Sequence, residues 1–233
     1  MTLTDPYSPL RKRVRALIPL TIQRKLLLYR RLPVYRRAGI VFIHVPKNAG
    51  SSVNEVLFGK FIGHFTAEEV FRADPKLKSI PSFALARNPW ARALSAYRFA
   101  RNERGEGGKV TAYINRAAQY RVPEFETFER FVREWLPFQD IETADPVFRL
   151  QTSYVCNNRN DILVEHVGRV ENLEPTTQWL EQRINRKIAF PQSNRTAAGG
   201  NFQDAYSPET RKIIGEIYGK DAEIFGYRFD DGW

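Results

Sequence analysis

Residues 42–52, FIHVPKNAGSS, combine residue types that bind anions at the start of a helix. An apolar run stops at a proline, and a lysine, small residues and two serines follow. A strand that turns into a helix in this way directs several backbone N–H groups at one point, where the helix dipole adds partial positive charge. Lys47 supplies a full charge, and Gly50 permits close approach of the backbone. With the hydroxyls of Ser51 and Ser52, the loop is predicted to hold a phosphate-like anion.

This loop differs from the phosphate loop of ATP-dependent kinases. The pattern G-x-x-x-x-G-K-[ST] is absent, because the lysine here precedes the glycine. No strand ends in an obvious aspartate that would hold magnesium. The loop taken alone is also compatible with an ordinary strand–turn–helix that binds nothing.

A second motif, ALARNPWARALSAYRF at 84–99, places Arg87 at the end of another apolar run and Ser95 eight residues later. A guanidinium can hold a phosphate with two parallel hydrogen bonds, and a serine on the following helix can add a third. Arg87 alone would more often form a surface ion pair. Two anion-binding motifs at one edge of a sheet fit a ligand that is phosphorylated at two places.

Together the two motifs resemble the sulfotransferases that use 3′-phosphoadenosine-5′-phosphosulfate, in particular the heparan 2-O-like branch of carbohydrate sulfotransferases. FIHVPKNAGSS is similar to the 5′-phosphosulfate loop of that family, and RNPWARALSAY to its 3′-phosphate motif. The family loop commonly reads Lys, any residue, Gly-Gly-Thr/Ser, so Ala49 replaces a glycine and is expected to keep a negative φ. Other segments with this resemblance are GH (63–64), LQTSYV (150–155), VGRVENL (167–173), SNRT (193–196) and IYGKDAEIFGYRF (217–229). The resemblance extends over about residues 40–229.

The resemblance implies sulfuryl transfer to an acceptor hydroxyl or amine, with release of adenosine 3′,5′-bisphosphate and no need for a metal. Lys47 would reach the bridging oxygen, where negative charge grows as the S–O bond breaks. The 3′-phosphate would contact Arg87 and Ser95. The remaining donor-binding residues implied are Asn48, Ala49, Gly50, Ser51 and Ser52 around the 5′-phosphate, and Asn194, Arg195 and Thr196 at the far end of the nucleotide.

His64 is the candidate general base, because the 2-O branch carries a catalytic histidine in a similar Gly-His pair. A side chain with a free pKa of ~6.5 suits this task, and the rate is expected to rise with pH through an apparent pKa near 6–7. Glu68 and Glu69 are the alternatives, since other branches use a carboxylate base. A structural role for His64 is the remaining interpretation. His44 and His166 are expected to be strand residues.

The alternation of strand-like and helix-like segments predicts an α/β fold. Apolar runs of strand length lie at 39–45, 79–86 and 161–170, and helical patterns at 51–61, 88–101, 123–137, 175–184 and 207–225. We expect a single P-loop-like domain with a central parallel sheet flanked by helices, and a helical insertion opened by GEGG (105–108). Residues 1–38 are expected to form a basic N-terminal extension and 39–233 the sulfotransferase domain.

The positive charge is concentrated at the N-terminus. The formal net charge is +10, but residues 1–40 hold ten Lys or Arg and one acid, which leaves 26 basic and 25 acidic residues in the rest. Nucleic-acid binding by the body is therefore disfavoured. Residues 11–37 mix aliphatic and cationic side chains, which predicts either a solvated arm or peripheral contact with an anionic membrane or glycan surface.

The remaining composition points to a reducing compartment. Cys156 is the one cysteine, which excludes an intramolecular disulfide, and three scattered histidines give no zinc-ligand spacing. Since neither a bilayer-spanning apolar run nor a signal-peptide core is evident, we expect a cytoplasmic protein, at most peripheral to a membrane.

Two rival functions follow from the same residues. A kinase-like P-loop enzyme would require ATP and magnesium, and a non-enzymatic basic module would bind membrane or nucleic acid through residues 11–37. A carbohydrate or glycolipid acceptor is expected only because the chain resembles the 2-O branch. Gln151, Ser153 and Tyr154 are candidates for lining the acceptor cleft.

Overall fold

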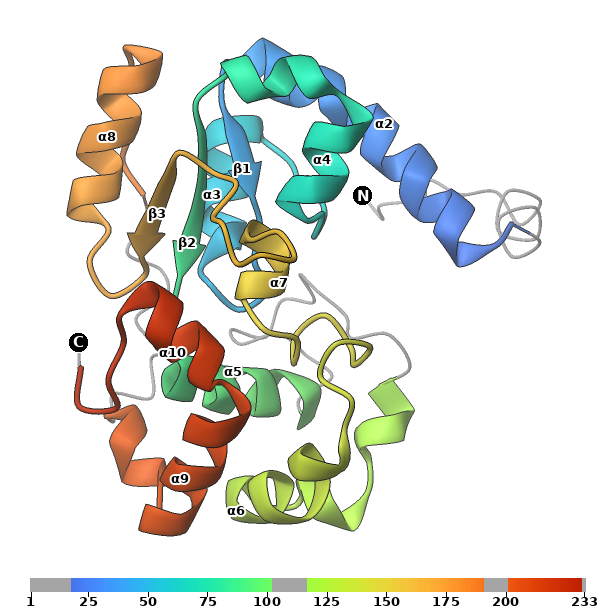
Figure 1. Cartoon of the computed structure of the whole chain (residues 1–233), viewed down its shortest axis with the longest axis vertical. Helices are drawn as coiled ribbons and strands as arrows, with labels where there is room; N and C mark the ends of the chain where they lie inside the picture. Colours follow the sequence, from blue (N-terminus) through green and yellow to red (C-terminus); the bar gives the residue numbers. More distant parts are fainter. Residues whose placement is uncertain (1–17, 102–116, 191–200, 232–233) are drawn as a thin grey trace, which may run out of the picture.

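The computed structural model describes residues 18–101, 117–190 and 201–231 (Figure 1). The GEGG segment at 105–108, which was expected to open a helical insertion, lies outside the described residues. A three-stranded sheet lies at the centre of the upper half of the molecule, with helices on both sides (Figure 1). The predicted α/β class, with a central parallel sheet flanked by helices, is confirmed.

The sheet has the order β1-β2-β3, and both pairings are parallel. Its strands are β1 (Val41–Ile43), β2 (Ser82–Ala86) and β3 (His166–Arg169). β1 and β2 are buried along their whole length, which explains their continuous apolar sequences. The third strand is shorter than the predicted 161–170, because Ile162 instead forms an antiparallel bridge with Cys156.

The described helices alternate with these strands as predicted. They are α2 (Leu20–Ala38), α3 (Gly50–Phe58), α4 (Ala67–Ala73), α5 (Pro89–Arg101), α6 (Phe128–Arg130), α7 (Thr152–Val155), α8 (Glu174–Ile184), α9 (Pro208–Ile217) and α10 (Gly219–Phe225). Asn88 caps α5 as expected, since its Oδ1 accepts a hydrogen bond of 3.1 Å from the backbone N–H of Trp90. The predicted last helix is divided at Tyr218, which lies between α9 and α10.

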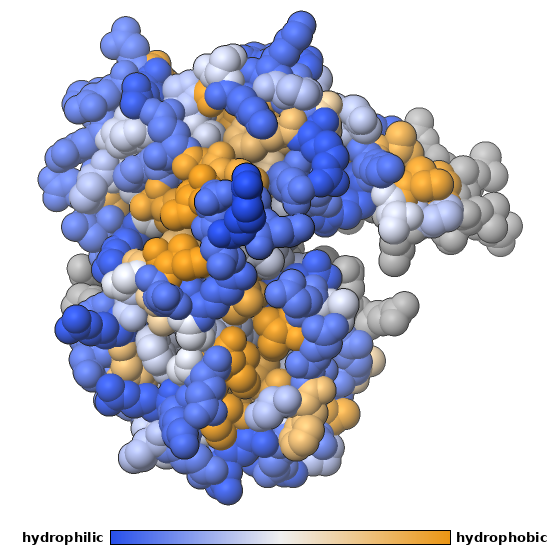
Figure 2. Space-filling model, in the orientation of Figure 1, coloured by the Kyte–Doolittle hydropathy of each residue, from blue (hydrophilic) through white to orange (hydrophobic). Residues whose placement is uncertain are grey.

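The helix α2 belongs partly to the core around the sheet. Leu28, Leu32 and Tyr35 are at most 6% exposed and pack in the same cluster as β1 and β2. The N-terminal half of α2 extends beyond the body, where apolar surface is visible on it (Figures 1 and 2). Part of the basic segment is thus built into the fold. None of the helices within the described residues is long and apolar enough to cross a membrane.

A second core cluster fills the lower half of the molecule, between α5, α9 and residues 120–148. The predicted helix at 123–137 is wrong in form: it is divided into 3₁₀ turns at Pro123–Phe125 and Leu136–Phe138, the short α6, and a π-helical turn at Phe131–Trp135. The rings of Phe125, Phe131 and Trp135 lie with their centroids 5.0–5.5 Å apart. Packing these rings together takes precedence over regular helical hydrogen bonding. The aromatic residues Phe125 and Phe128, at helical spacing in the sequence, are buried in this core, whereas Trp135 is partly buried.

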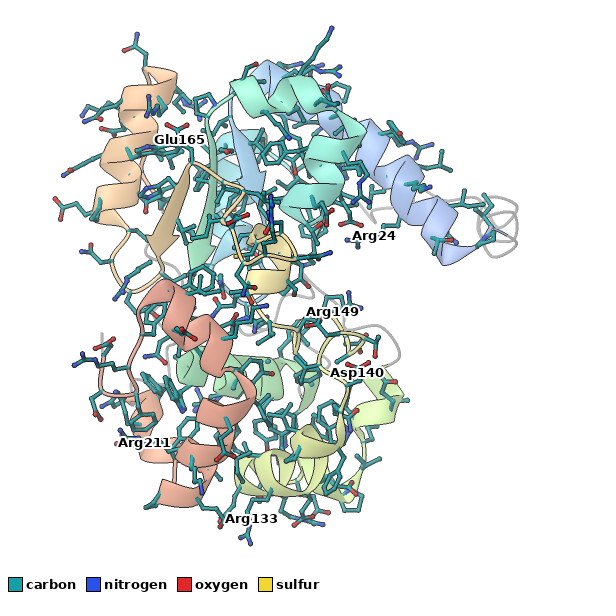
Figure 3. The ribbon with its side chains drawn as sticks, in the orientation of Figure 1. Arg24, Arg133, Asp140, Arg149, Glu165 and Arg211 are labelled. Carbon is teal, nitrogen blue, oxygen red and sulfur yellow. The ribbon has the colours of Figure 1, made fainter. Side chains whose placement is uncertain are left out.

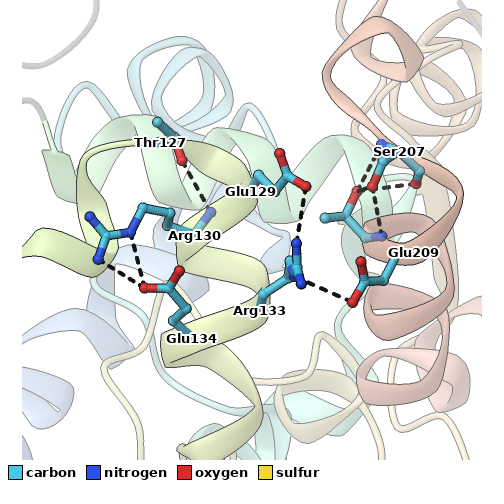
Figure 4. Close-up of polar contacts among 8 residues, drawn as sticks. Thr127, Glu129, Arg130, Arg133, Glu134, Ser207 and Glu209 are labelled. Atoms are coloured by element: carbon cyan, nitrogen blue, oxygen red, sulfur yellow. Dashed lines mark hydrogen bonds and ion pairs between the residues drawn. The ribbon is translucent and has the colours of Figure 1, made fainter.

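An ion pair on the surface connects this segment to α9. Arg133, labelled in Figure 3, lies 3.5 Å from Glu129 and 3.3 Å from Glu209 (Figure 4). All three side chains are about half exposed, so the pairs contribute little to stability and mainly fix orientation.

Candidate active site

The loop between β1 and α3 has an unusual backbone. Lys47 and Ala49 have φ values of 69° and 56°, in the left-handed region. The expectation that Ala49 keeps a negative φ was wrong: it is the N-cap of α3, and a left-handed residue there turns the chain into the helix. Each such non-glycine residue costs about 1 kcal/mol or more. Left-handed residues alternating with ordinary ones turn successive N–H groups toward one side, as in anion-binding nests.

His44 lies directly beneath the start of α3. A Cβ at Gly50 would come within 2.0 Å of the His44 ring, so only glycine fits there without displacing that ring. Asn54 Nδ2 lies 2.9 Å from His44 Nδ1, and Phe42 stacks on the other side. Burial lowers the pKa of His44 well below its ordinary value, with smaller effects of His64 and Lys47. The neutral imidazole therefore supports the loop. His44 was expected within the strand, but it lies directly after β1.

Gln151 joins the two predicted anion-binding motifs. Its Oε1 accepts hydrogen bonds from Asn48 Nδ2 (2.6 Å) and from the backbone N–H of Arg87 (2.9 Å), and its Nε2 donates to the Arg87 carbonyl (2.9 Å). Arg87 Nη1 also donates to the Lys47 carbonyl over 3.2 Å. The structure thus brings together residues that the sequence places 40 positions apart.

Gln151 is fully buried, so it does not line an acceptor cleft as the sequence suggested. Tyr154 is also buried and donates to the Pro146 carbonyl, and Ser153 donates to the Leu150 carbonyl. The backbone N–H of Gln151 donates to Asp221 over 2.8 Å, which holds the residue in place. Gln151 is therefore a positioning residue for both motifs.

We expect Gln151→Leu to weaken binding of adenosine 3′,5′-bisphosphate by at least tenfold. The leucine would remove the Gln151 side chain from the Arg87 backbone N–H and carbonyl and would leave the Asn48 amide with its Leu85 carbonyl bond alone. Each buried group that loses its partner costs ~1–3 kcal/mol. Calorimetric titration would measure the loss, and circular dichroism would check the fold. Gln203→Leu is the matched control, because Gln203 Nε2 bonds the Phe229 carbonyl instead. Equal losses in both variants would contradict the positioning role.

A buried arginine that sequence reasoning missed also contacts the first loop. Arg92 in α5 is 2% exposed, and it donates to the Pro46 carbonyl (3.1 Å) and the Val147 carbonyl (3.2 Å). Its position among alanines and aromatics in RNPWARALSAY was a usable signal, because an arginine on a buried helix face needs a specific partner. Ser95 is buried on the same helix, and Ser52 is buried in α3 while Ser51 is exposed.

His64 has the tautomer that a general base requires. Since a carbonyl only accepts, Nδ1 must donate to the His44 carbonyl at 2.9 Å, which leaves the lone pair on Nε2. The ring lies 4.2 Å from that of His44 and 5.1 Å from that of Phe61, between centroids. Burial lowers the pKa of His64 to about 4, assisted by Arg24, Arg92 and Lys47 and opposed by the bond to His44. In the free protein this imidazole is therefore neutral at pH 7, with a pKa below the free value of ~6.5.

The two alternative bases are engaged in ion pairs. Both oxygens of Glu69 accept from Arg24 at 2.7 Å, and the backbone N–H of Thr66 donates to it over 2.8 Å in a capping box. Burial raises the pKa of Glu69, but the hydrogen bonds from Arg24 and Thr66 outweigh it and the net shift is downward. Glu68 is exposed and pairs with Arg72. These contacts favour His64 over either carboxylate.

The other sequence-predicted residues lie in various places. His166 is on β3, with Nε2 3.0 Å from Thr176 Oγ1 and its ring stacked on Trp179, which fits a structural role. Lys47 Nζ lies 4.2 Å from the centre of the Phe99 ring. Asn194, Arg195 and Thr196 lie outside the described residues. Within the described part of the chain, no group of three His, Cys, Asp or Glu side chains is arranged to hold a metal.

Comparison with known proteins gives one match. The model of the sulfotransferase family matches residues 30–228, which is most of the chain. No curated protein and no solved structure matches it. The matched range includes both predicted anion-binding motifs and His64, whereas the first half of α2 precedes it.

Proposed function

Because the chain belongs to the sulfotransferase family, it is an enzyme that transfers a sulfuryl group, and we propose that it uses 3′-phosphoadenosine-5′-phosphosulfate as donor and a carbohydrate or glycolipid hydroxyl as acceptor. The observation that carries the donor proposal is the connection made by Gln151. It joins the Lys47 loop and Arg87, so that two separate anion-binding groups lie at one edge of the sheet. A nucleotide with phosphates at the 5′ and 3′ positions would engage both groups.

The roles of the donor-binding residues follow from their chemistry. The backbone N–H groups of residues 48–52 hold the 5′-phosphate at the start of α3. The left-handed Ala49 makes the turn that leads from the loop into this helix. Arg87 and Ser95 hold the 3′-phosphate, and Asn194, Arg195 and Thr196 are proposed to close over the nucleotide. Arg92 adds a buried positive charge behind the loop. Interactions among fixed groups need little reorganisation when the anion binds.

In the transfer step, the acceptor oxygen forms a bond to sulfur while the bond between sulfur and the bridging oxygen breaks. The acceptor proton moves to His64 Nε2, which carries the lone pair because Nδ1 is held by the His44 carbonyl. The electron pair of the breaking bond remains on the bridging oxygen, and Lys47 stabilises that charge. The products are the sulfated acceptor and adenosine 3′,5′-bisphosphate.

An exposed aromatic ring supports a carbohydrate acceptor. Phe61 is 50% exposed, although its ring contacts the rings of His44 and His64. The apolar C–H face of a sugar can pack on such a ring, which would bring a hydroxyl to the base. Sulfate transfer to a panel of glycans, glycolipids and amines, read by mass, would identify the acceptor class.

We expect adenosine 3′,5′-bisphosphate to bind about 10- to 150-fold more tightly than AMP. The 3′-phosphate gains a charge-assisted contact with Arg87, worth about 1.5–3 kcal/mol. Titration calorimetry in EDTA would measure both affinities. In Arg87→Gln the preference should disappear, whereas Arg98→Gln, a change on the following helix α5, should retain it. Equal affinities in the wild type, or a strict magnesium requirement, would contradict the donor proposal and favour a kinase-like enzyme.

A further inference from the structure

The outward face of α2 carries an apolar stripe, formed by Ile22, Leu26 and Tyr29. These side chains are 48%, 48% and 56% exposed. Their spacing of four and three residues places them on one face of the helix, about 120° around the axis from the residues buried in the core. Pro33, also exposed, continues the same line. Three large apolar side chains exposed in one row require an explanation that a single exposed leucine would not.

Positive charge borders the stripe on both sides. At 100° per residue, Lys25 falls on one side of it, and Arg30 and Arg37 fall on the other. All three are exposed, and the sequence of α2, LTIQRKLLLYRRLPVYRRA, contains no acidic residue. Two further arginines of the helix are engaged elsewhere, Arg24 with Glu69 and Arg36 with Asp74. The exposed face is therefore apolar along its centre and cationic along its edges.

We infer that the α2 stripe docks on an anionic lipid surface. A helix that lies in a bilayer interface inserts its apolar side chains below the headgroups and keeps its cations at their level, which is the arrangement observed. The projecting N-terminal half of α2 would allow the helix to reach a flat surface without obstruction by the body (Figure 1).

Charge disfavours the other candidates for this face. A second copy of the chain, packed through the same face about a two-fold axis, would place cations against cations with no acid of α2 to balance them. A nucleic-acid backbone would satisfy the cations but would place Ile22 and Leu26 against phosphates. An anionic lipid surface satisfies the charged edges and the apolar centre together.

Binding of the full chain to vesicles of phosphatidylcholine and phosphatidylglycerol at 7:3 tests this inference. We expect the apparent affinity, measured by flotation, to be at least tenfold higher for these vesicles than for pure phosphatidylcholine. High salt should weaken the binding. Ile22→Ser/Leu26→Ser/Tyr29→Ser should reduce the affinity at least tenfold. Lys25→Gln/Arg30→Gln should reduce it by about fivefold for each cation removed.

Two matched controls distinguish binding through this face from nonspecific binding to vesicles. Phe138→Ser removes an apolar side chain that is 78% exposed on the other half of the molecule, and Lys212→Gln/Lys220→Gln removes two exposed cations there. Both should bind like the wild type, and all variants should retain their affinity for adenosine 3′,5′-bisphosphate. Equal binding to both vesicle types would overturn the inference. The inference would also be overturned if sedimentation showed a dimer that only the stripe variant abolishes. It would likewise be overturned if short duplex DNA bound through the stripe and displaced the protein from the vesicles.

Discussion

His64→Asn is expected to lower turnover by about 100- to 10,000-fold, the usual contribution of a positioned base. The asparagine amide can replace Nδ1–H as donor to the His44 carbonyl, so the loop contact observed at 2.9 Å is preserved while the base is removed. Affinity for adenosine 3′,5′-bisphosphate should remain within about threefold of the wild type, because the imidazole is proposed to contact the acceptor and not the donor. Single-turnover measurements of sulfate transfer, with calorimetry for binding, would test both.

His166→Asn is the matched control. His166 bonds Thr176 and stacks on Trp179, away from the loop, so the same replacement there should leave turnover unchanged. A purely structural His64 would give a different pattern, in which thermal stability and nucleotide affinity fall together. Near-normal turnover in His64→Asn would transfer the role of base to Glu69 or Glu68.

The titration of His64 gives an independent test of its environment. In the free protein, NMR of the imidazole should show protonation near pH 4, because burial favours the neutral ring. The base is therefore active above this pH and lost below it. Bound adenosine 3′,5′-bisphosphate adds negative charge near the ring and should raise the pKa. A free-protein pKa of 6–7 would show that water reaches the ring.

Lys47→Met is expected to reduce kcat by about 100- to 1,000-fold while the Michaelis constant for the donor changes much less. Methionine keeps most of the length but removes the charge that is proposed to stabilise the leaving oxygen, and one such group typically contributes this much. Steady-state kinetics over a range of donor concentrations would separate the two parameters. Lys60→Met, an exposed lysine after α3, is the control and should have no effect. A change confined to the Michaelis constant would contradict the leaving-group role.

The sequence predicted features that depend on local signals. The buried strands β1 and β2 were evident as apolar runs, and Asn88-Pro89 marked the start of α5 through capping. The parallel order of the sheet followed from the alternation of strands and helices. Local patterns were less reliable at 123–138, where ring packing among distant aromatics divides what would otherwise be one helix.

The site residues show the same division. Lys47 and Arg87 were proposed from their motifs, and the structure brings the two segments into contact, while their roles stay predictions. Gln151 was misassigned because its partners, Asn48 and Arg87, are 103 and 64 residues away, so that no local pattern reports them. The pKa of His64 could not be predicted either, since it depends on burial and on cations contributed by three separate segments.

The left-handed residues of the first loop affect the entropy of ligand binding. A loop with glycine at position 49 would sample many backbone conformations when empty and would lose that freedom when an anion binds. Alanine at the same φ of 56° has fewer conformations to lose, and Gln151 and Arg92 restrict the neighbouring residues further. Anion capture should therefore carry a small entropic penalty and a nearly temperature-independent loop geometry, so that the empty loop already has the shape of the occupied one.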